Sequence, residues 1–577
     1  MTRTDSFVVG TLVVLLALIA GLVGLPSVLP ASLGAATPSP TTGSVVSRPY
    51  REGVLGRPVS VSPLSARTQA DRDLVSLVFS GLVRNGPSGT LVPDLAERWT
   101  VDPTGAVWNF QLRDLARWHD GEPVTAADVA FTIHTMQEPT YTGPGTGSWN
   151  EVTVTTSGTR TVIFTLKTPL GGFLQAATQP IAPAHILAGV PVDELASGTF
   201  GRQPIGSGPF AVASLSDDAA ELIPAATLLL GDEPTGGTPR ATDSLATPAP
   251  VTRSNGPIPY LPALEFHFYD DPAALAAAYR EGSLDVASGL SPALTSDLAA
   301  AADSRALRYP GSTLTAVLLN LRPGHPEFTD PAVRTALLAA INRSSIITNA
   351  YAMAALPAND PIPPASAVFD PGADPPVPYN VAAAQAALKK AGWTLAADGW
   401  HLPKVTTPIV IELLSPTEAS NPAAFGAAEA VTRDWDAIGL TVTHLPLPPG
   451  ELVTGRIATG RFRVVVGDVN VGLDPDLYAL LASSQTVTGG SNIIGLQDPA
   501  LDALLVAARA TGTDAKRAAA YSALQKQLAK GRYLLPIAYA DESIVVRDTL
   551  KGPVIRQVAD PADRFWDVLT WRLAADR

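Results

Sequence analysis

The chain has 577 residues, a formal net charge of −13, and 46% hydrophobic against 16% charged residues. This length exceeds what one compact core supports, so two or three lobes are expected, and the composition is that of a globular protein. The acidic balance argues against a general nucleic-acid binder. The absence of cysteine excludes disulfides, thiolate metal sites and a cysteine nucleophile.

The N-terminus carries a membrane-targeting segment. Residues 7–25 (FVVGTLVVLLALIAGLVGL) contain no charge and follow Arg3. A spanning helix needs roughly 20 apolar residues, whereas the core of a signal peptide has ~7–15. Length therefore favours a retained anchor within residues 1–30, while the small residues at 34–37 keep a cleaved signal peptide open. In both cases the bulk of the chain is extracytoplasmic, behind a linker at 31–47.

The first motif with possible chemistry follows an alternating strand at 106–113. It is RWHDGEPVTAADVAF at 117–131, in which His119, Asp120 and Glu122 resemble a metal or acid–base cluster. No second histidine lies at helical or hairpin spacing, and no HExxH occurs. A structural reading explains the same letters, because Asp120 and the following glycine form a turn and Thr125 begins a helix with a Thr-x-x-Asp capping pattern. We therefore expect scaffold here, with no metal, cofactor or catalytic residue.

The remaining elements alternate between strand and helix, which predicts a mixed α/β fold. A Pro/Thr/Gly-rich tract at about 231–259 is expected to be an insertion on the surface. The expected strands are 161–167, 314–322 and 462–469, and the expected helices are 330–342, 381–392 and 514–530. Asp330 is the expected N-cap of the first of these helices, with Pro331 at its first position.

The motifs resemble, in order, those of bacterial extracellular solute-binding proteins of family 5, the oligopeptide-, dipeptide- and nickel-binding components of ABC importers. Each segment alone is weakly specific, and their common order makes the resemblance strong. The segments are Val78–Ile133, Pro204–Phe210, Tyr279–Gly289, Leu318–Ile346, Ala382–Trp393, Asp474–Ser484 and Ser491–Arg509.

This resemblance implies a bilobed periplasmic-binding-protein fold of the large, three-domain type II class, in which ligand is enclosed by lobe closure. The implied first domain comprises residues 48–85, 203–318 and 533–577, and carries the insertion. The second domain is implied at 86–202 and the third at 319–532.

The resemblance also implies how a ligand is held. Relatives bind the ammonium group of a peptide through an aspartate that follows an apolar strand, which corresponds here to Asp468 in VVVGDVNVGLDPD. Asn320, at the end of another apolar strand, and Ser80 with Gly81, in the first motif, are expected to line the cleft. Ordinary turn or capping roles are the alternative for these residues. Asp474 is expected to be such a cap, before Pro475.

The function implied is that of a monomeric, membrane-anchored or secreted binding protein that delivers peptides to the permease subunits of an ABC importer. Alternatives on the same fold are binding of an oligosaccharide or a nickel chelate, and a sensory role without transport. An enzyme is not expected, because the sequence contains no phosphate loop, no Gly-x-Ser-x-Gly elbow and no convincing Ser/His/Asp arrangement.

Overall fold

The structure is a computed structural model that describes residues 48–86, 90–145, 149–225, 260–486, 490–510 and 514–574. Residues 45–577 form one compact unit. The expected anchor, the linker and the tract at 231–259 lie outside the described residues. Within the described ranges, no helix is both long enough and apolar enough to cross a membrane.

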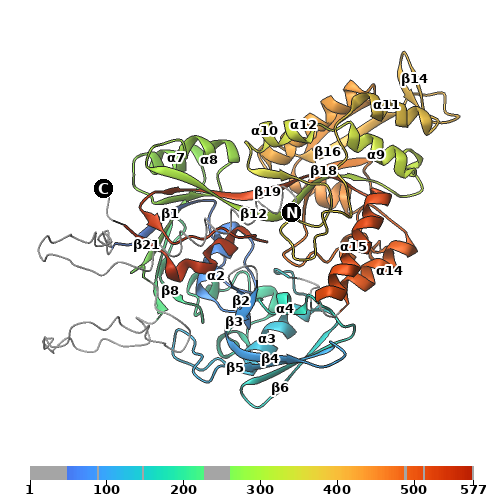
Figure 1. The fold of residues 1–577 in the computed structure, drawn as a ribbon. Coiled ribbons are helices and arrows are strands. Elements are labelled where there is room, and N and C mark those ends of the chain that lie inside the picture. Colours follow the sequence, from blue (N-terminus) through green and yellow to red (C-terminus); the bar gives the residue numbers. More distant parts are fainter. Residues whose placement is uncertain are drawn as a thin grey trace, which may run out of the picture. The chain divides into compact units, whose positions relative to one another are not determined.

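A large mixed sheet of 11 described strands organises the unit, with β12 and β19 side by side near its middle (Figure 1). Along the sheet the order is β17 (Thr441–Leu447), β16 (Val410–Pro416), β18 (Val464–Asn470), β12 (Ser304–Leu319), β19 (Leu535–Arg547), β11 (Val286–Ser288), β1 (Tyr50–Leu55), β10 (Leu264–Tyr269), β9 (Ala219–Pro224) and β8 (Phe210–Leu215). The short strand β13 (Ala355–Pro357) pairs with β19 as well.

The strand β12 has 16 residues and pairs antiparallel with both β18 and β19. Sequence periodicity predicts only its second half, because Pro310 and the following glycine interrupt the alternation at a register shift between Pro310 and Leu314. From Leu314 to Leu319 every residue is buried, which fits a strand covered on both faces. β12 thus connects the two ends of the sheet.

Helices cover both faces of the part of the sheet formed by β12, β16 and β18. Val317 and Val466 point into a core with α9, α10, α11 and α12, whereas Leu318 and Val465 point into another with α13, α14 and α15. The helices are α9 (Pro331–Ala339), α10 (Arg343–Ala350), α11 (Val381–Lys390), α12 (Pro422–Ala437), α13 (Tyr478–Leu481), α14 (Pro499–Arg509) and α15 (Asp514–Gly531). The other half of the sheet packs on α2 (Gln69–Val78), α7 (Pro272–Arg280) and α8 (Pro292–Leu298).

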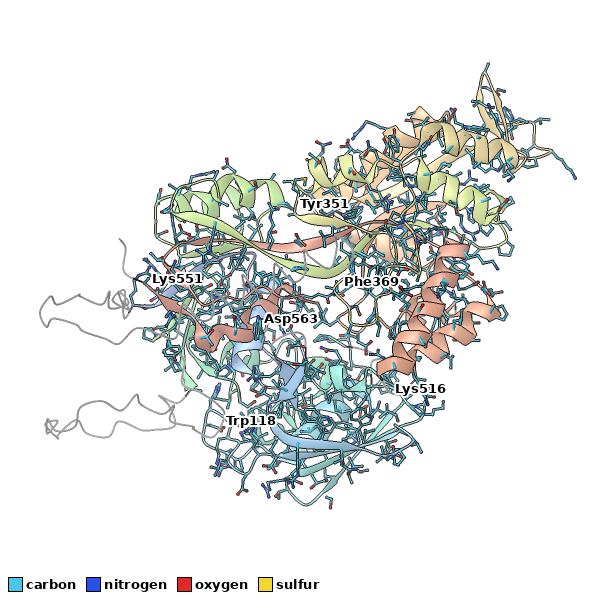
Figure 2. All side chains as sticks on the ribbon, viewed as in Figure 1. Trp118, Tyr351, Phe369, Lys516, Lys551 and Asp563 are labelled. Carbon is cyan, nitrogen blue, oxygen red and sulfur yellow. The ribbon has the colours of Figure 1, made fainter. Side chains whose placement is uncertain are left out.

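A second, four-stranded sheet packs on α3 (Ala126–Gln137), and Figure 2 labels Trp118, which is fully buried in this part of the chain. Its strands run in the order β4 (Ala96–Val101), β5 (Val107–Leu112), β7 (Thr161–Leu166) and β6 (Val152–Ser157). Short elements complete the fold: strands β2 (Val83–Asn85), β3 (Leu91–Pro93), β14 (Thr394–Ala396), β15 (Gly399–His401), β20 (Leu550–Lys551) and β21 (Arg572–Leu573), and helices α4 (Phe173–Ala176), α5 (Ala184–Leu187), η2 (Val192–Glu194), η3 (Thr199–Arg202), η4 (Pro326–Phe328), η5 (Glu451–Ile457), η6 (Ser483–Gln485) and η7 (Pro561–Thr570).

The expected elements are present. The predicted strands at 106–113, 161–167 and 462–469 correspond to β5, β7 and β18, and the predicted helices at 330–342, 381–392 and 514–530 to α9, α11 and α15. Asp330 caps α9, as predicted, by accepting a hydrogen bond of 2.8 Å from the amide of Ala332. The division into three domains stays a prediction.

Candidate functional site

Two of the quoted segments, Val78–Ile133 and Pro204–Phe210, meet at one buried histidine. The Nδ1 atom of His119 accepts from the amide of Gly206 at 3.2 Å, and its Nε2 lies 3.0 Å from the carbonyl oxygen of Gly208. Because Nδ1 accepts, Nε2 carries the proton and donates, and burial lowers the pKa of this imidazole. The hydroxyl of Ser207 in the same glycine motif lies 3.3 Å from the amide of Ser80, from which it accepts a hydrogen bond. His119 is therefore a scaffold residue.

The other polar residues of the motif at 117–131 also have structural partners. Asp120 contacts His185 at 2.9 Å, and the carboxylate of Asp128 accepts from the amide and hydroxyl of Thr125 at 2.8 and 2.9 Å. In the part of the chain that the structure describes, no group of three or more His, Asp or Glu side chains could hold a metal ion. The scaffold interpretation of residues 117–131 is supported by these contacts.

Ser80, whose amide donates to Ser207 of the glycine motif, lines a cavity of about 490 Å³. Ser80 and Gly81 line it, as do side chains of α2, of β2 and of η7. A volume of this size falls in the range of ~300–1,000 Å³ that is usual for small-ligand pockets. We name it the Ser80 cavity.

Asp94 faces the Ser80 cavity beside the two predicted residues. Its carboxylate accepts hydrogen bonds from the Ser80 side chain and the Gly81 backbone. Burial raises its pKa to about 6, an effect that the nearby cations Arg84 and Arg113 oppose. Ser80 and Gly81 therefore hold a carboxyl group at the wall as well as lining the space.

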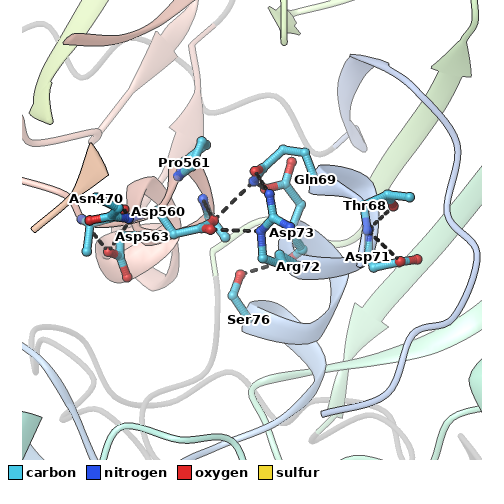
Figure 3. Close-up of polar contacts among 12 residues, drawn as sticks. Thr68, Gln69, Asp71, Arg72, Asp73, Ser76, Asn470, Asp560, Pro561 and Asp563 are labelled. Atoms are coloured by element: carbon cyan, nitrogen blue, oxygen red, sulfur yellow. Dashed lines mark hydrogen bonds and ion pairs between the residues drawn. The ribbon is translucent and has the colours of Figure 1, made fainter. Parts of the chain in front are cut away.

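The opposite wall joins α2 to the C-terminal helix η7 (Figure 3). Arg72 lies 2.7 Å from Asp560, and the amide group of Gln69 donates to the same carboxylate at 3.2 Å. Asp560 also caps η7, accepting from the amide of Ala562 at 2.9 Å. Arg72 and Asp560 both line the Ser80 cavity.

A buried ionic cluster lies next to this wall. Arg564 of η7 binds Asp73 of α2 at 2.7 Å and Glu52 of β1 at 2.8 Å, and the hydroxyl of Tyr50 donates to Glu52 at 2.6 Å. The side chains of all three ionic groups are at most 3% exposed. Breaking such a pair costs ~3–5 kcal/mol, because it leaves an uncompensated buried charge. The cluster fixes η7 against the first strand and the first described helix.

Asp468 lies on β18, on the face that α10 and α12 cover. Its Oδ1 accepts from the hydroxyl of Thr315 at 2.5 Å, and its Oδ2 from the amide group of Asn421, the N-cap of α12, at 2.8 Å. Since the Thr315 proton goes to Asp468, the hydroxyl of Tyr351, 2.6 Å away, donates to Thr315. The carboxylate remains exposed and can accept further hydrogen bonds.

β18 also contacts the segment that leads into η7. Asn470, two residues beyond Asp468 on the same face, donates to the carbonyl oxygen of Ala559 at 2.8 Å. Glu542 of β19 lies in the same electrostatic environment. Burial first, and then the charge of Asp560, raise the pKa of Glu542 to about 7, and Asp468 contributes in the same direction. The Asp468 environment is therefore acidic and adjoins the wall of the Ser80 cavity.

Asn320 lies neither beside Asp468 nor on the wall of the Ser80 cavity. It is fully buried, and its amide group donates to the carbonyl oxygens of Gly460 and Phe462 at 3.1 and 2.7 Å. Its side-chain oxygen accepts from Arg322. Five residues along β12 separate it from Thr315, or ~17 Å at the usual rise per residue. Asn320 thus closes the end of the strand with its own hydrogen bonds.

A further contact joins distant segments of the chain. The amide of Gly171 donates to the carbonyl oxygen of Arg509 at 2.9 Å. Gly172 lies against Asp474, which pairs with Arg517 of α15. The expectation that Asp474 is a local cap is wrong, because Asp476 is the residue that accepts from the first amide of α13, at 3.0 Å.

Sequence reasoning missed Arg84, Arg556, Asp560 and Glu542. Arg84 lies inside a quoted motif, but nothing in the letters distinguishes it from a surface arginine. The other three belong to β19 and the segment after it. Only tertiary contacts bring Arg556 and Asp560 to the Ser80 cavity and Glu542 into the acidic environment of Asp468.

Comparison with known proteins places this geometry in context. A sequence model described as bacterial extracellular solute-binding proteins, family 5 Middle, matches residues 90–492, which is more than half of the chain. A putative ABC transporter peptide-binding protein of Brucella ovis is 27% identical over 499 residues, covering 85% of this chain and 86% of that protein.

Two solved structures show the same fold. The oligopeptide-binding protein AppA of Bacillus subtilis, in complex with a nonapeptide, has a TM-score of 0.71 at 21% identity and covers 92% of this chain and 99% of that one. NikZ of Campylobacter jejuni, in complex with Ni(L-His), has a TM-score of 0.70 at 23% identity and covers 92% and 100%. The expected α/β periplasmic-binding-protein fold is confirmed.

Proposed function

The chain belongs to the bacterial extracellular solute-binding proteins of family 5, and we propose that it binds peptides outside the cytoplasm and delivers them to an ABC importer. The family is one of binding proteins rather than enzymes. The match over residues 90–492 carries this proposal. The peptide ligands named for the Brucella ovis relative and for AppA support it.

Asp468 is proposed as the anchor of the peptide ammonium group. Thr315 and Asn421 hold its two oxygens from inside the protein, so the carboxylate is oriented before ligand arrives. A charge-assisted hydrogen bond contributes ~1.5–3 kcal/mol, which corresponds to roughly 10–150-fold in affinity. Glu542 and Asp560 add negative potential around the same position.

Ligand enclosure is proposed to follow the bilobed, three-domain scheme implied by the resemblance. Gly171 and Gly172 belong to the implied second domain, whereas Asp474 and Arg509 belong to the implied third. Their contacts support a closed arrangement of these two domains. Peptide backbone bound along exposed strand edges would supply affinity that does not depend on side chains.

The partners follow from this role. We propose a monomer that is anchored in the membrane through residues 7–25, or secreted after their removal, and that docks on the permease subunits of an importer. No nucleic-acid partner and no cofactor belong to the proposal.

A nickel chelate is the second candidate, because NikZ is named as a Ni(L-His) complex. An oligosaccharide would need exposed aromatic platforms, and of the nine tryptophans seven are buried, with at most 7% exposure, whereas Trp99 and Trp566 are half-buried. A sensory receptor without transport would use the same fold and the same closure.

Native mass spectrometry of the protein, purified without refolding, tests the ligand class. Bound masses that fragment as peptides are expected. The mass of a nickel chelate or of a sugar would instead assign the protein to nickel-chelate or oligosaccharide binding.

The anchor is tested by Asp468→Asn, with Asp436→Asn, an exposed change on α12, as the matched control. Asp468→Asn should lower the affinity for free-amine peptides at least ~tenfold and leave the affinity for their N-acetylated forms unchanged. Equal losses for both forms would discredit Asp468 as the ammonium anchor.

A further inference from the structure

We propose that Glu542 binds a cationic side chain, of lysine or arginine, in one of the first two residues of the peptide ligand. This inference rests on the proposed peptide-binding function. It adds a residue that selects among peptides, whereas Asp468 is proposed to hold the amine that every free peptide carries.

Glu542 lies on β19, opposite Tyr309 of β12 in the strand register. The pairing of β12 becomes irregular just after Tyr309, at Pro310. The segment before η7 is bonded to this irregularity. The amide of Val558 donates to the carbonyl oxygen of Pro310 at 2.9 Å, and its carbonyl oxygen accepts from the amide of Ser312 at 3.0 Å. The segment before η7 therefore lies against β12 close to Glu542.

This packing places Glu542 among other carboxylates. Asp560 follows in the segment just described. Asp468 lies on β18, and Asn470 of the same strand donates to the carbonyl oxygen of Ala559 at 2.8 Å. The charges of Asp560 and Asp468 both make the ionisation of Glu542 less favourable. Glu542 is thus close to the proposed amine anchor.

The carboxylate of Glu542 has no protein partner. It is half-buried, and within the described ranges of the chain it forms neither a hydrogen bond nor an ion pair. The neighbouring acids differ in this respect, because Asp560 pairs with Arg72 at 2.7 Å and Asp73 pairs with Arg564 at 2.7 Å. Glu542 therefore keeps an uncompensated charge that a ligand can use.

The charged groups that act on Glu542 are mostly acidic. They are Asp560 at the start of η7, Arg564 of η7, Asp73 of α2 and Asp468 of β18, and Arg564 is the one that opposes the others. Together with burial, they raise the pKa of Glu542 to about 7. An ionised carboxylate is costly in such a place, and a charge-assisted hydrogen bond from a bound cation offsets the cost.

The position of the cation in the peptide follows from chain geometry. Consecutive Cα atoms lie ~3.8 Å apart, and successive side chains of an extended peptide point to opposite sides. With the amine at Asp468, the side chains of the first two residues are near enough to reach Glu542, and they point in opposite directions. One of these two positions should therefore favour a basic residue.

The test compares tetrapeptides that differ in a single charge. Lys-Ala-Ala-Ala and Ala-Lys-Ala-Ala are titrated by calorimetry into the full-length protein, beside analogues with norleucine in place of lysine. Norleucine keeps the four-carbon side chain and lacks the ammonium group. The variant is Glu542→Gln. Asp541→Asn is the matched control, because it removes a half-buried acid at the adjacent position of β19, where the side chain points to the opposite face.

At one of the two positions, lysine should bind at least ~tenfold more tightly than norleucine to the wild type and to Asp541→Asn. This ratio should approach one in Glu542→Gln. Because a lysine ammonium stays charged to about pH 10, the ratio in the wild type should also fall at least ~threefold between about pH 8 and about pH 5.5, as Glu542 takes up a proton.

Equal affinity for lysine and norleucine at both positions of the wild type would overturn the inference and leave peptide binding intact. The inference is also overturned if Glu542→Gln keeps the ratio, since Glu542 would then act on the amine alone, or if Asp541→Asn loses it as fully. Where Glu542→Gln does not fold, a ratio that is independent of pH in the wild type overturns it. Binding of no peptide at all would overturn the proposed function, and the inference with it.

Discussion

Replacing Gly172 by alanine should hinder the proposed lobe closure without harming the fold. The backbone at Gly172 has φ −83° and ψ 5°, values that alanine adopts without strain. An added Cβ would lie 2.2 Å from Oδ2 of Asp474, far inside contact distance. Asp474 cannot swing away freely, because Arg517 holds its other oxygen.

The cost follows from this overlap. Overpacking of a well-fitted contact costs ~1–3 kcal/mol, since neighbouring groups shift only partly. If the contact exists only in the closed form, the whole cost falls on ligand binding, which corresponds to ~5–150-fold in affinity. The open form relieves the overlap, so the free energy of unfolding without ligand should not change.

Calorimetry with a peptide pool measures the loss, and small-angle scattering measures the ligand-induced decrease in radius of gyration. Gly189→Ala is the control, because no heavy atom lies within 4 Å of its added Cβ. The reasoning is refuted if Gly172→Ala binds and compacts like the wild type, or if Gly189→Ala loses as much affinity.

Three further changes probe charge and packing. Glu542→Gln should remove most of the rise in affinity for free-amine peptides between about pH 5.5 and about pH 7.5, because the pKa of Glu542, raised by burial to about 7, places its ionisation there; an unchanged pH profile would count against it. Burial raises the pKa of Asp360 to about 7, so the native state binds its proton more tightly than the unfolded chain and stability falls as pH rises from about 4 to about 7. Asp360→Asn should therefore lessen the decrease in unfolding free energy between about pH 5 and about pH 8 by roughly 3 kcal/mol, measured by urea denaturation; an identical decrease would exclude this carboxyl group as the cause. Gly206→Ala places a Cβ 1.9 Å from the carbonyl oxygen of Val78, and should lower the unfolding free energy by roughly 1–3 kcal/mol; wild-type stability would mean that this contact yields easily.

Local signals in the sequence predict the local structure well. The aspartate–proline pair at the start of α9, the alternation in β5 and β7, and the glycine after α11 are each signals carried by a few adjacent residues. Only half of β12 is predictable, because its first part contains Arg305, Arg308 and Pro310 and gains its order from pairing with β19 rather than from an apolar pattern. The first part of β12 is a strand because it pairs with β19.

In the candidate site, too, some residues could be selected from the sequence and others only from tertiary contacts. Ser80 and Gly81 could be selected from a family motif, and they do line a cavity. Asp468 could be selected from its place after an apolar strand, but its two internal partners could not. Arg556 becomes meaningful only through its burial against Trp566 and its position beside Gly86, and no spacing in the chain encodes that proximity.

The cluster of Glu52, Asp73 and Arg564 determines when this protein can finish folding. Arg564 is 512 residues from Glu52 and 491 from Asp73. Until that arginine has been synthesised, β1 and α2 cannot pack without burying two uncompensated carboxylates. β1 and α2 therefore stay incompletely packed while the 491 residues from Asp73 to Arg564 are added, and an incompletely folded chain is the state in which a polypeptide can still be threaded across a membrane.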